Sequence, residues 1–164
     1  MPLGIFDSGI GGLTVVRALR AAFPLRDILY VGDTARVPYG NKSPETVQTY
    51  SREIVDFLEK KGAERIVAAC NTASALAVGS LAKTRQTPLH GMIESGVAAA
   101  LAAGEGPVGV IGTPATIASG AYQKALAKAR PGMKVVAQAT PLLVPLVEEG
   151  WLEGEVTEKV ARQY

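Results

Sequence analysis

The only cysteine of the chain, Cys70, lies where a short apolar run meets a row of small polar residues. Residues 66–69 suit a strand buried on both faces, and residues 71–74 suit the start of a helix. Cys70 is therefore expected at the carboxyl end of a strand, where ligands bind in open α/β sheets. The dipole of a helix start favours a thiolate by about 0.3–1 kcal/mol, which predicts a Cys70 pKa on the order of one unit below the ordinary value. A thiol poised near neutral pH can both accept and return a proton, as a general acid/base must.

A lone cysteine is more often a small buried apolar residue than a catalyst. Asn71 and Thr72 weigh against that simpler interpretation, because they follow the thiol directly. Two polar side chains at this point can cap the helix, and they can equally bind the carboxylate of a small ligand.

Other expected strand ends also carry polar groups. In a parallel sheet these ends share one edge, so the groups can converge on one pocket. Each group has a structural explanation as a turn former, a packing residue or a helix cap, but their joint placement favours a ligand site. The groups are Asp7 and Ser8, Tyr39 with Gly40, Cys70 with Asn71 and Thr72, and Thr113 with Thr116.

The glycine-rich turn after Asp7 does not match a dinucleotide-binding fingerprint. Gly9, Gly11 and Gly12 give the spacing Gly-x-Gly-Gly, whereas the fingerprint is Gly-x-Gly-x-x-Gly. Asp33 lies about 20 residues further on, as the fingerprint asks, but the spacing of the glycines argues against nucleotide binding.

Strands and helices alternate along the chain, which predicts an α/β fold with a mainly parallel sheet, or two such sheets. The expected helices include one that starts at Ser43 and stops at Gly62, one over residues 97–103, one from residue 114 to about residue 129, a new element from residue 144, and an amphipathic helix over residues 155–164. The expected strands cover residues 3–6, 28–31, 66–69, 89–93, 108–111 and 135–139.

Composition excludes several classes of protein. The 164 residues are 48% hydrophobic and 20% charged, which is ample material for a core. A net charge of +2 without a basic cluster argues against nucleic-acid binding. No stretch approaches the roughly 20 apolar residues of a membrane span, and no signal peptide precedes the first strand. One cysteine excludes an intramolecular disulfide and a cysteine-rich zinc site, so a reducing, cytoplasmic compartment is expected.

Three stretches together resemble glutamate racemases, and the resemblance extends over essentially the whole chain. They are Asp-Ser-Gly-Ile-Gly-Gly-Leu-Thr-Val at residues 7–15, Tyr-Val-Gly-Asp-Thr-Ala-Arg-Val-Pro-Tyr-Gly at residues 30–40, and Ala-Cys-Asn-Thr-Ala-Ser-Ala at residues 69–75. The resemblance implies cofactor-independent racemisation that supplies D-glutamate for peptidoglycan synthesis. It also implies two similar α/β lobes, each with a mainly parallel sheet flanked by helices, and an amino acid bound between them.

The expected division places residues 1–94 in a first lobe with Asp7, the Tyr39 loop and Cys70. Residues 95–164 form the beginning of a second lobe, which is expected to be incomplete. The boundary is placed at residues 94–96, between the fourth strand and the helix after it.

The resemblance also implies the roles of individual residues. Cys70 resembles the first of two catalytic cysteines, Asp7 a carboxylate that assists it and contacts the substrate ammonium, and Glu148 an acidic residue near the opposite base. L- and D-glutamate are the implied ligands, with no cofactor, metal, nucleic acid or membrane, and a homodimer is compatible with the family. The implied substrate contacts are Asp7, Ser8, Tyr39, Gly40, Asn71, Thr72, Thr113 and Thr116.

The chain departs from the family pattern at the second catalytic cysteine and its nearby histidine, which are both absent. His90, the only histidine, lies in the fourth expected strand and is interpreted as a packing or edge residue. The last expected helix has no stop signal. A chain truncated at its C-terminus explains these features, and the 164 residues alone are not expected to racemise glutamate.

Two alternatives stay open. One is a single-cysteine member of the same superfamily, such as a decarboxylase or another amino-acid racemase, although the Tyr39 loop argues against it. The other is an inactive module that binds an acidic ligand, although Asp7, Cys70 and Thr72 argue for an active site. Rapid, glutamate-protected alkylation of Cys70 would distinguish an active base from an inert thiol.

Overall fold

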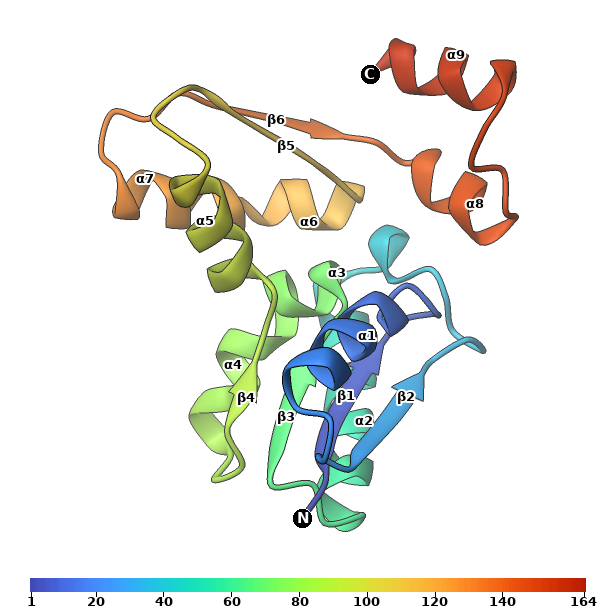
Figure 1. Cartoon of the computed structure of the whole chain (residues 1–164), viewed down its shortest axis with the longest axis vertical. Helices are drawn as coiled ribbons and strands as arrows, with labels where there is room; N and C mark the ends of the chain where they lie inside the picture. The colour runs from blue at the N-terminus through green and yellow to red at the C-terminus, as the bar shows by residue number, and fades with distance from the viewer.

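The strands form two separate parallel sheets in the computed structural model, which describes all residues from 1 to 164 (Figure 1). The prediction of an α/β fold with one or two parallel sheets is therefore confirmed. The first sheet has the order β2-β1-β3-β4, with β1 (Leu3–Asp7), β2 (Ile28–Gly32), β3 (Arg65–Ala68) and β4 (Leu89–His90). The second sheet pairs β5 (Val108–Gly112) with β6 (Val135–Ala139).

We call the part of the chain that carries β1 to β4 the first lobe. Its apolar core includes Phe6, Leu58 and Ile66, which are fully buried between the sheet and α2. Besides the strands it contains α1 (Leu13–Ala22), η1 (Tyr39–Asn41), α2 (Pro44–Lys60), α3 (Asn71–Ala73), the π-helical turn η2 (Ser74–Val78), α4 (Gly79–Leu81) and η3 (Ala82–Thr84).

Helix α2 begins and ends where the sequence predicts. The Ser43 side chain caps it by accepting a hydrogen bond from the Thr46 N–H at 3.2 Å, and Pro44 occupies its first turn. After Lys60 the chain reaches Gly62, whose φ of +83° lies in the left-handed region that glycine tolerates best. This long helix covers the first sheet and places the loop before it beside the ends of the strands.

We call the part that carries β5 and β6 the second lobe; α5 (Ile93–Ala102) connects it to β4. Ile93, Val97 and Leu126 form its small core. Helices lie along one side of the β5–β6 pair, while Ile111 and Val136 are exposed (Figure 1). The other helices of this lobe are α6 (Pro114–Ser119), α7 (Ala121–Ala129), α8 (Leu143–Glu148) and α9 (Glu155–Gln163).

Three predicted elements have the wrong extent. The strand predicted over residues 89–93 ends at His90, because Ile93 already begins α5, and the helix predicted over residues 97–103 therefore starts four residues early. The single helix predicted from residue 114 to residue 129 is two helices, because Gly120 adopts a left-handed conformation with φ +66° and separates α6 from α7.

The predicted lobe boundary at residues 94–96 falls in the first half of α5. The division of the chain into residues 1–94 and 95–164 stays a prediction. None of the helices has both the length and the apolar composition that crossing a membrane requires.

Candidate active site

A cleft of about 560 Å³ lies between the two lobes at the carboxyl ends of β1 and β3. Its walls come from both lobes. Thr116, the one predicted site residue outside this lining, lies buried directly behind Thr72 and Thr113. The other nine predicted residues all line the cleft: Asp7, Ser8, Tyr39, Gly40, Cys70, Asn71, Thr72, Thr113 and Glu148.

Cys70 is the residue that caps α3, and it is 5% exposed. The Cys70 thiol donates to Ser8 Oγ at 3.6 Å, and Sγ accepts from the Ala73 N–H at 3.4 Å. Burial raises the pKa of the thiol, and the charge of Asp7 raises it further. The hydrogen bond from the Ala73 N–H lowers it, and so does Ser8, whose hydroxyl can turn to donate to the thiolate. The thiol is therefore neutral at neutral pH.

The prediction of a lowered Cys70 pKa is thus wrong in sign. The helix start does contribute a stabilising N–H to the sulfur, as expected. Desolvation of the thiolate nevertheless outweighs that hydrogen bond, because burying a charge costs more than a single donor restores.

Asp7 ends β1, and the glycine-rich turn folds back over its carboxylate. Asp7 Oδ2 accepts from the N–H groups of Gly9 and Gly12, each at 3.1 Å. A Cβ on Gly12 would lie 2.6 Å from the Asp7 Cβ, so only glycine permits this close approach. The turn fixes one carboxylate oxygen, and Oδ1 has no hydrogen-bond partner within the chain.

Tyr30 holds this turn from the neighbouring strand β2. Its phenol donates to the Gly9 carbonyl at 3.0 Å. Burial raises the pKa of Tyr30 to about 12, with further contributions from the charges of Asp7, Cys70 and Glu148. Tyr30 therefore remains a hydrogen-bond donor beside three acidic groups.

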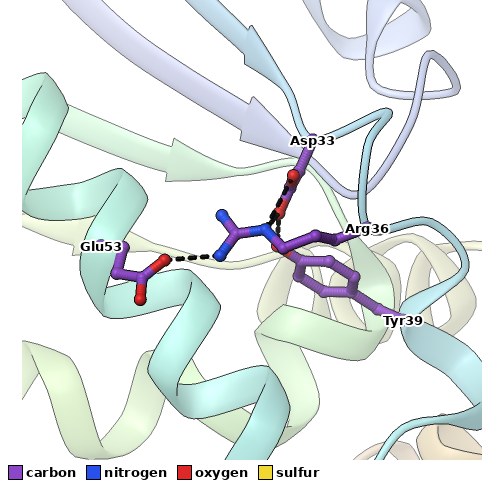
Figure 2. A network of polar contacts seen from close by, with 4 residues as sticks. All are labelled: Asp33, Arg36, Tyr39 and Glu53. Carbon is purple, nitrogen blue, oxygen red and sulfur yellow. Dashed lines mark hydrogen bonds and ion pairs between the residues drawn. The ribbon is translucent and has the colours of Figure 1, made fainter.

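A polar network holds the Tyr39 side chain (Figure 2). Tyr39 is 1% exposed, and its phenol donates to Asp33. Arg36 Nε donates to Asp33 Oδ1 at 3.0 Å. Arg36 also pairs with Glu53, and its guanidinium lies 4.1 Å from the centre of the Tyr50 ring. Burial and the bond to Asp33 raise the pKa of Tyr39, so the phenol keeps its proton and donates it in the hydrogen bond to Asp33.

Three threonine hydroxyls join the lobes at the wall of the cleft. Thr72 Oγ1 lies 2.9 Å from Thr113 Oγ1 and 3.2 Å from Thr116 Oγ1, and Thr113 and Thr116 are 2.9 Å apart. Thr113 also caps α6 by accepting from the Thr116 N–H. Gly40 packs against Thr113 so closely that a Cβ there would lie 2.4 Å from the Thr113 Cβ.

Glu148 and His90 lie in very different places. Glu148, from the second lobe, lines the cleft and places Oε1 3.0 Å from the position that a Cβ on Gly9 would occupy. His90 is exposed on the edge strand β4, as predicted. No group of three or more His, Cys, Asp or Glu side chains could hold a metal ion.

Four residues of the site were not predicted from the sequence: Asp33, Arg36, Tyr30 and Tyr122. Asp33 directly follows β2, so the rule that polar residues after strand ends face the site could have found it. Tyr122 Oη donates to Asn71 Oδ1 at 2.6 Å across the lobes. An aromatic residue on an amphipathic helix gives no sequence signal for such a contact.

Comparison with known proteins gives one family and many close relatives. The family described as Asp/Glu/Hydantoin racemase matches residues 13–164. Glutamate racemase from Aquifex aeolicus (strain VF5) is 53% identical over 165 residues, covering 100% of this chain and 64% of the relative. Glutamate racemase from Geobacter metallireducens is also 53% identical and is covered over 60% of its length.

Solved structures give the same result. Glutamate racemase from Francisella tularensis in complex with D-glutamate superposes with a TM-score of 0.93 at 41% identity, over 99% of this chain and 62% of that one. The Campylobacter jejuni glutamate racemase gives 0.94 at 41% identity, over 100% and 66%. The chain thus spans less than two thirds of the length of these relatives.

Proposed function

The chain belongs to the Asp/Glu/hydantoin racemase family, and from this premise we propose that the whole protein interconverts L- and D-glutamate without a cofactor. The observation that carries the proposal is the placement of Cys70 beside Ser8 and Asp7 in the cleft between the lobes. The relative from Francisella tularensis, whose structure contains D-glutamate, shares this fold over 99% of the chain.

In this proposal Cys70 is the base on one face of the substrate. Its thiolate removes the α-proton and becomes a thiol, while the electron pair of the C–H bond delocalises into the α-carboxylate. A second acid on the opposite face then protonates the carbanion, which inverts the configuration without oxidation or reduction. The 164 residues hold one cysteine, so we assign the second thiol to chain outside them.

Asp7 prepares Cys70 for proton transfer. The free Asp7 oxygen is suited to accept a hydrogen bond from the substrate ammonium, whose positive charge offsets the negative charge that raises the Cys70 pKa. Substrate binding therefore favours the thiolate, and the Ser8 and Ala73 donors stabilise it. The base becomes reactive only when a cationic ligand is present.

The remaining cleft residues bind and enclose the substrate. Asn71 and the hydroxyls of Thr72 and Thr113 supply donors for carboxylates, which stabilises charge as it develops in the transition state. Thr116 supports those two hydroxyls from behind. The Tyr39–Gly40 loop and Glu148 both line the cleft, and we assign Glu148 to the face opposite Cys70.

The wider role follows from the product. We propose that the protein acts in the cytoplasm, supplies D-glutamate for peptidoglycan, and works as a homodimer.

The test is α-proton exchange of each glutamate enantiomer in D2O, combined with circular dichroism of the amino acid and the intact mass of the purified protein. The whole protein should exchange and racemise both enantiomers, and Cys70→Ala should lower the rate by about 10²–10⁴-fold, the usual contribution of a general acid/base. The 164-residue chain alone should not racemise. Release of CO2, or binding of glutamate without exchange by the whole protein, would overturn the proposal.

A further inference from the structure

Tyr122 reaches across the cleft from α7 of the second lobe to Asn71 at the start of α3 in the first. Its phenol donates to Asn71 Oδ1 at 2.6 Å, and both residues line the cleft. The separation fits an O–H···O bond, which is typically about 2.5–3.0 Å, and is shorter than the usual N–H···O range. The contact therefore involves the amide oxygen of Asn71 rather than its nitrogen.

The phenol is a dependable donor in this contact. Burial raises the pKa of Tyr122, and the nearby charge of Glu94 raises it further. The Met92 carbonyl is the only other acceptor near the phenol, and at 3.5 Å it is much the longer contact. The single O–H proton of Tyr122 is thus directed at Asn71.

This bond determines what Asn71 presents to a ligand. An amide side chain has one acceptor oxygen and an NH2 group with two donors. Because the oxygen is taken by Tyr122, the NH2 group, which has no partner within the chain, is what remains at the cleft. A reversed amide would present an oxygen, which repels a carboxylate.

Tyr122 packs directly against Gly96 of α5, where there is no room for a side chain on residue 96. A Cβ at this position would lie 2.8 Å from Tyr122 Cε1 and 3.0 Å from its hydroxyl oxygen. A methyl group there would push the end of the tyrosine away from Asn71. Gly96 therefore offers a way to displace the phenol without changing it.

We propose that Tyr122 is a positioning residue that orients the Asn71 amide so that its NH2 group receives a carboxylate of the bound amino acid. This inference rests on the proposed function for the identity of the ligand, but the orientation of the amide can be measured without it.

The first arm of the test is NMR of the ligand-free protein, following the Asn71 side chain. Tyr122→Phe removes the hydroxyl that donates to Asn71 Oδ1. This change should move the Asn71 ¹³Cγ resonance, which reports hydrogen bonding to Oδ1. Tyr164→Phe, which removes a phenol on the far end of the chain, should leave that resonance in place. If Tyr122→Phe moves only the Asn71 ¹⁵Nδ2 resonance, the amide is reversed and the inference is wrong.

The second arm is a double-mutant cycle on glutamate turnover by the whole protein. Tyr122→Phe should raise KM about 3- to 10-fold, the effect of one hydrogen bond, with a smaller change in kcat. In an Asn71→Ala background the same change should have no effect, because there is no amide left to orient. Gly96→Ala should raise KM in the same direction.

The outcomes separate the two proposals. If the unmodified protein does not racemise glutamate, the proposed function fails while the ¹³Cγ measurement still decides the orientation. If it racemises but Tyr122→Phe changes neither ¹³Cγ nor KM, the inference alone fails. A KM effect of equal size with and without Asn71 would show that Tyr122 acts only by holding the lobes together.

Discussion

At the scale of single residues, the cleft is distinguished by a thiol whose acidity is set by opposing neighbours. Cys70 is buried, which disfavours its charged form, and Asp7 adds to that effect, while Ser8 and Ala73 oppose it. The contributions of Asp7 and Ser8 to the Cys70 pKa can be measured separately, because each residue can be substituted on its own. Their effects on the thiol should have opposite signs.

Removal of the Asp7 charge should make Cys70 more reactive, although it should impair catalysis. Asp7→Asn lowers the Cys70 pKa because a like charge is lost, so iodoacetamide should alkylate the variant faster than the unmodified protein at the same pH. Ser8→Ala should slow alkylation, because a donor that lowers the pKa is lost. Equal alkylation rates across pH in the two variants would contradict this account of Cys70.

The raised Cys70 pKa also fixes the sign of its effect on stability. The folded state holds the thiol proton more tightly than the unfolded state does. The contribution of Cys70 is therefore fully present below the ordinary thiol pKa of about 8.5 and is lost as the pH rises through the folded-state value. Comparing Cys70→Ala with the unmodified protein in urea at pH 7 and above pH 9 should show this loss only in the unmodified protein.

The residues of the cleft were largely predictable, whereas the protonation of the thiol was not. Asp7, Cys70 and Thr113 could be found because polar residues after apolar runs lie at one edge of a parallel sheet. The Cys70 pKa depends on how completely the lobes exclude water, and one sequence does not show that. Tyr122 was missed because its role depends on which residue of the other lobe lies opposite.

At the scale of elements, the loop before α2 depends on the charged side chain of Asp33. Asp33 directly follows β2 and binds the side chains of both Arg36 and Tyr39 (Figure 2). Its N–H also donates to the Asp7 carbonyl at 3.0 Å. Asp33 thus links the strand that carries Asp7 to the Tyr39–Gly40 wall.

Loss of the Asp33 charge should destabilise the protein and weaken glutamate binding together. Hydrogen bonds to charged groups contribute about 1.5–3 kcal/mol, so Asp33→Asn should lower the free energy of unfolding by roughly that amount. Glu53→Gln is the matched control, because Glu53 is half exposed and an exposed pair contributes at most about 1 kcal/mol. Urea unfolding of both variants would measure the difference, and equal losses would show that the loop does not depend on the Asp33 charge.

Strand and helix positions were predictable from hydrophobic periodicity, but several ends were not. The Gly120 break between α6 and α7 is a left-handed backbone conformation inside a pattern that continues as a helix. The early end of β4 reflects that only His90 and Leu89 find partners on β3. Both depend on tertiary contacts that local pattern does not contain.

At the scale of the whole molecule, the two lobes approach each other through cleft residues. Gly40 meets Thr113, Thr72 meets Thr113 and Thr116, and Tyr122 meets Asn71 across the lobes. The spacing of the lobes is therefore set where the ligand is expected to bind.

A methyl group on Gly40 should force the lobes apart. Gly40→Ala places a Cβ 2.4 Å from the Thr113 Cβ, and such overpacking typically costs about 1–3 kcal/mol, or several degrees in Tm. Gly79→Ala is the control, since a Cβ there meets nothing within 4 Å and its φ of −62° suits alanine. Thermal unfolding and glutamate affinity should both fall for Gly40→Ala only; unchanged affinity would mean that the spacing of the lobes does not control binding.

The threonine hydroxyls that join the lobes have a consequence for how such a protein can change over generations. Thr72, Thr113 and Thr116 hold the two lobes together, and Thr72 and Thr113 also line the cleft. Selection for heat tolerance cannot strengthen the contacts among these three threonines without altering substrate preference. Selection for a new substrate cannot change the same threonines without weakening the contact between the lobes. Adaptation to temperature is therefore expected to accumulate away from the cleft, in places such as the buried face of α2, where a substitution changes stability alone.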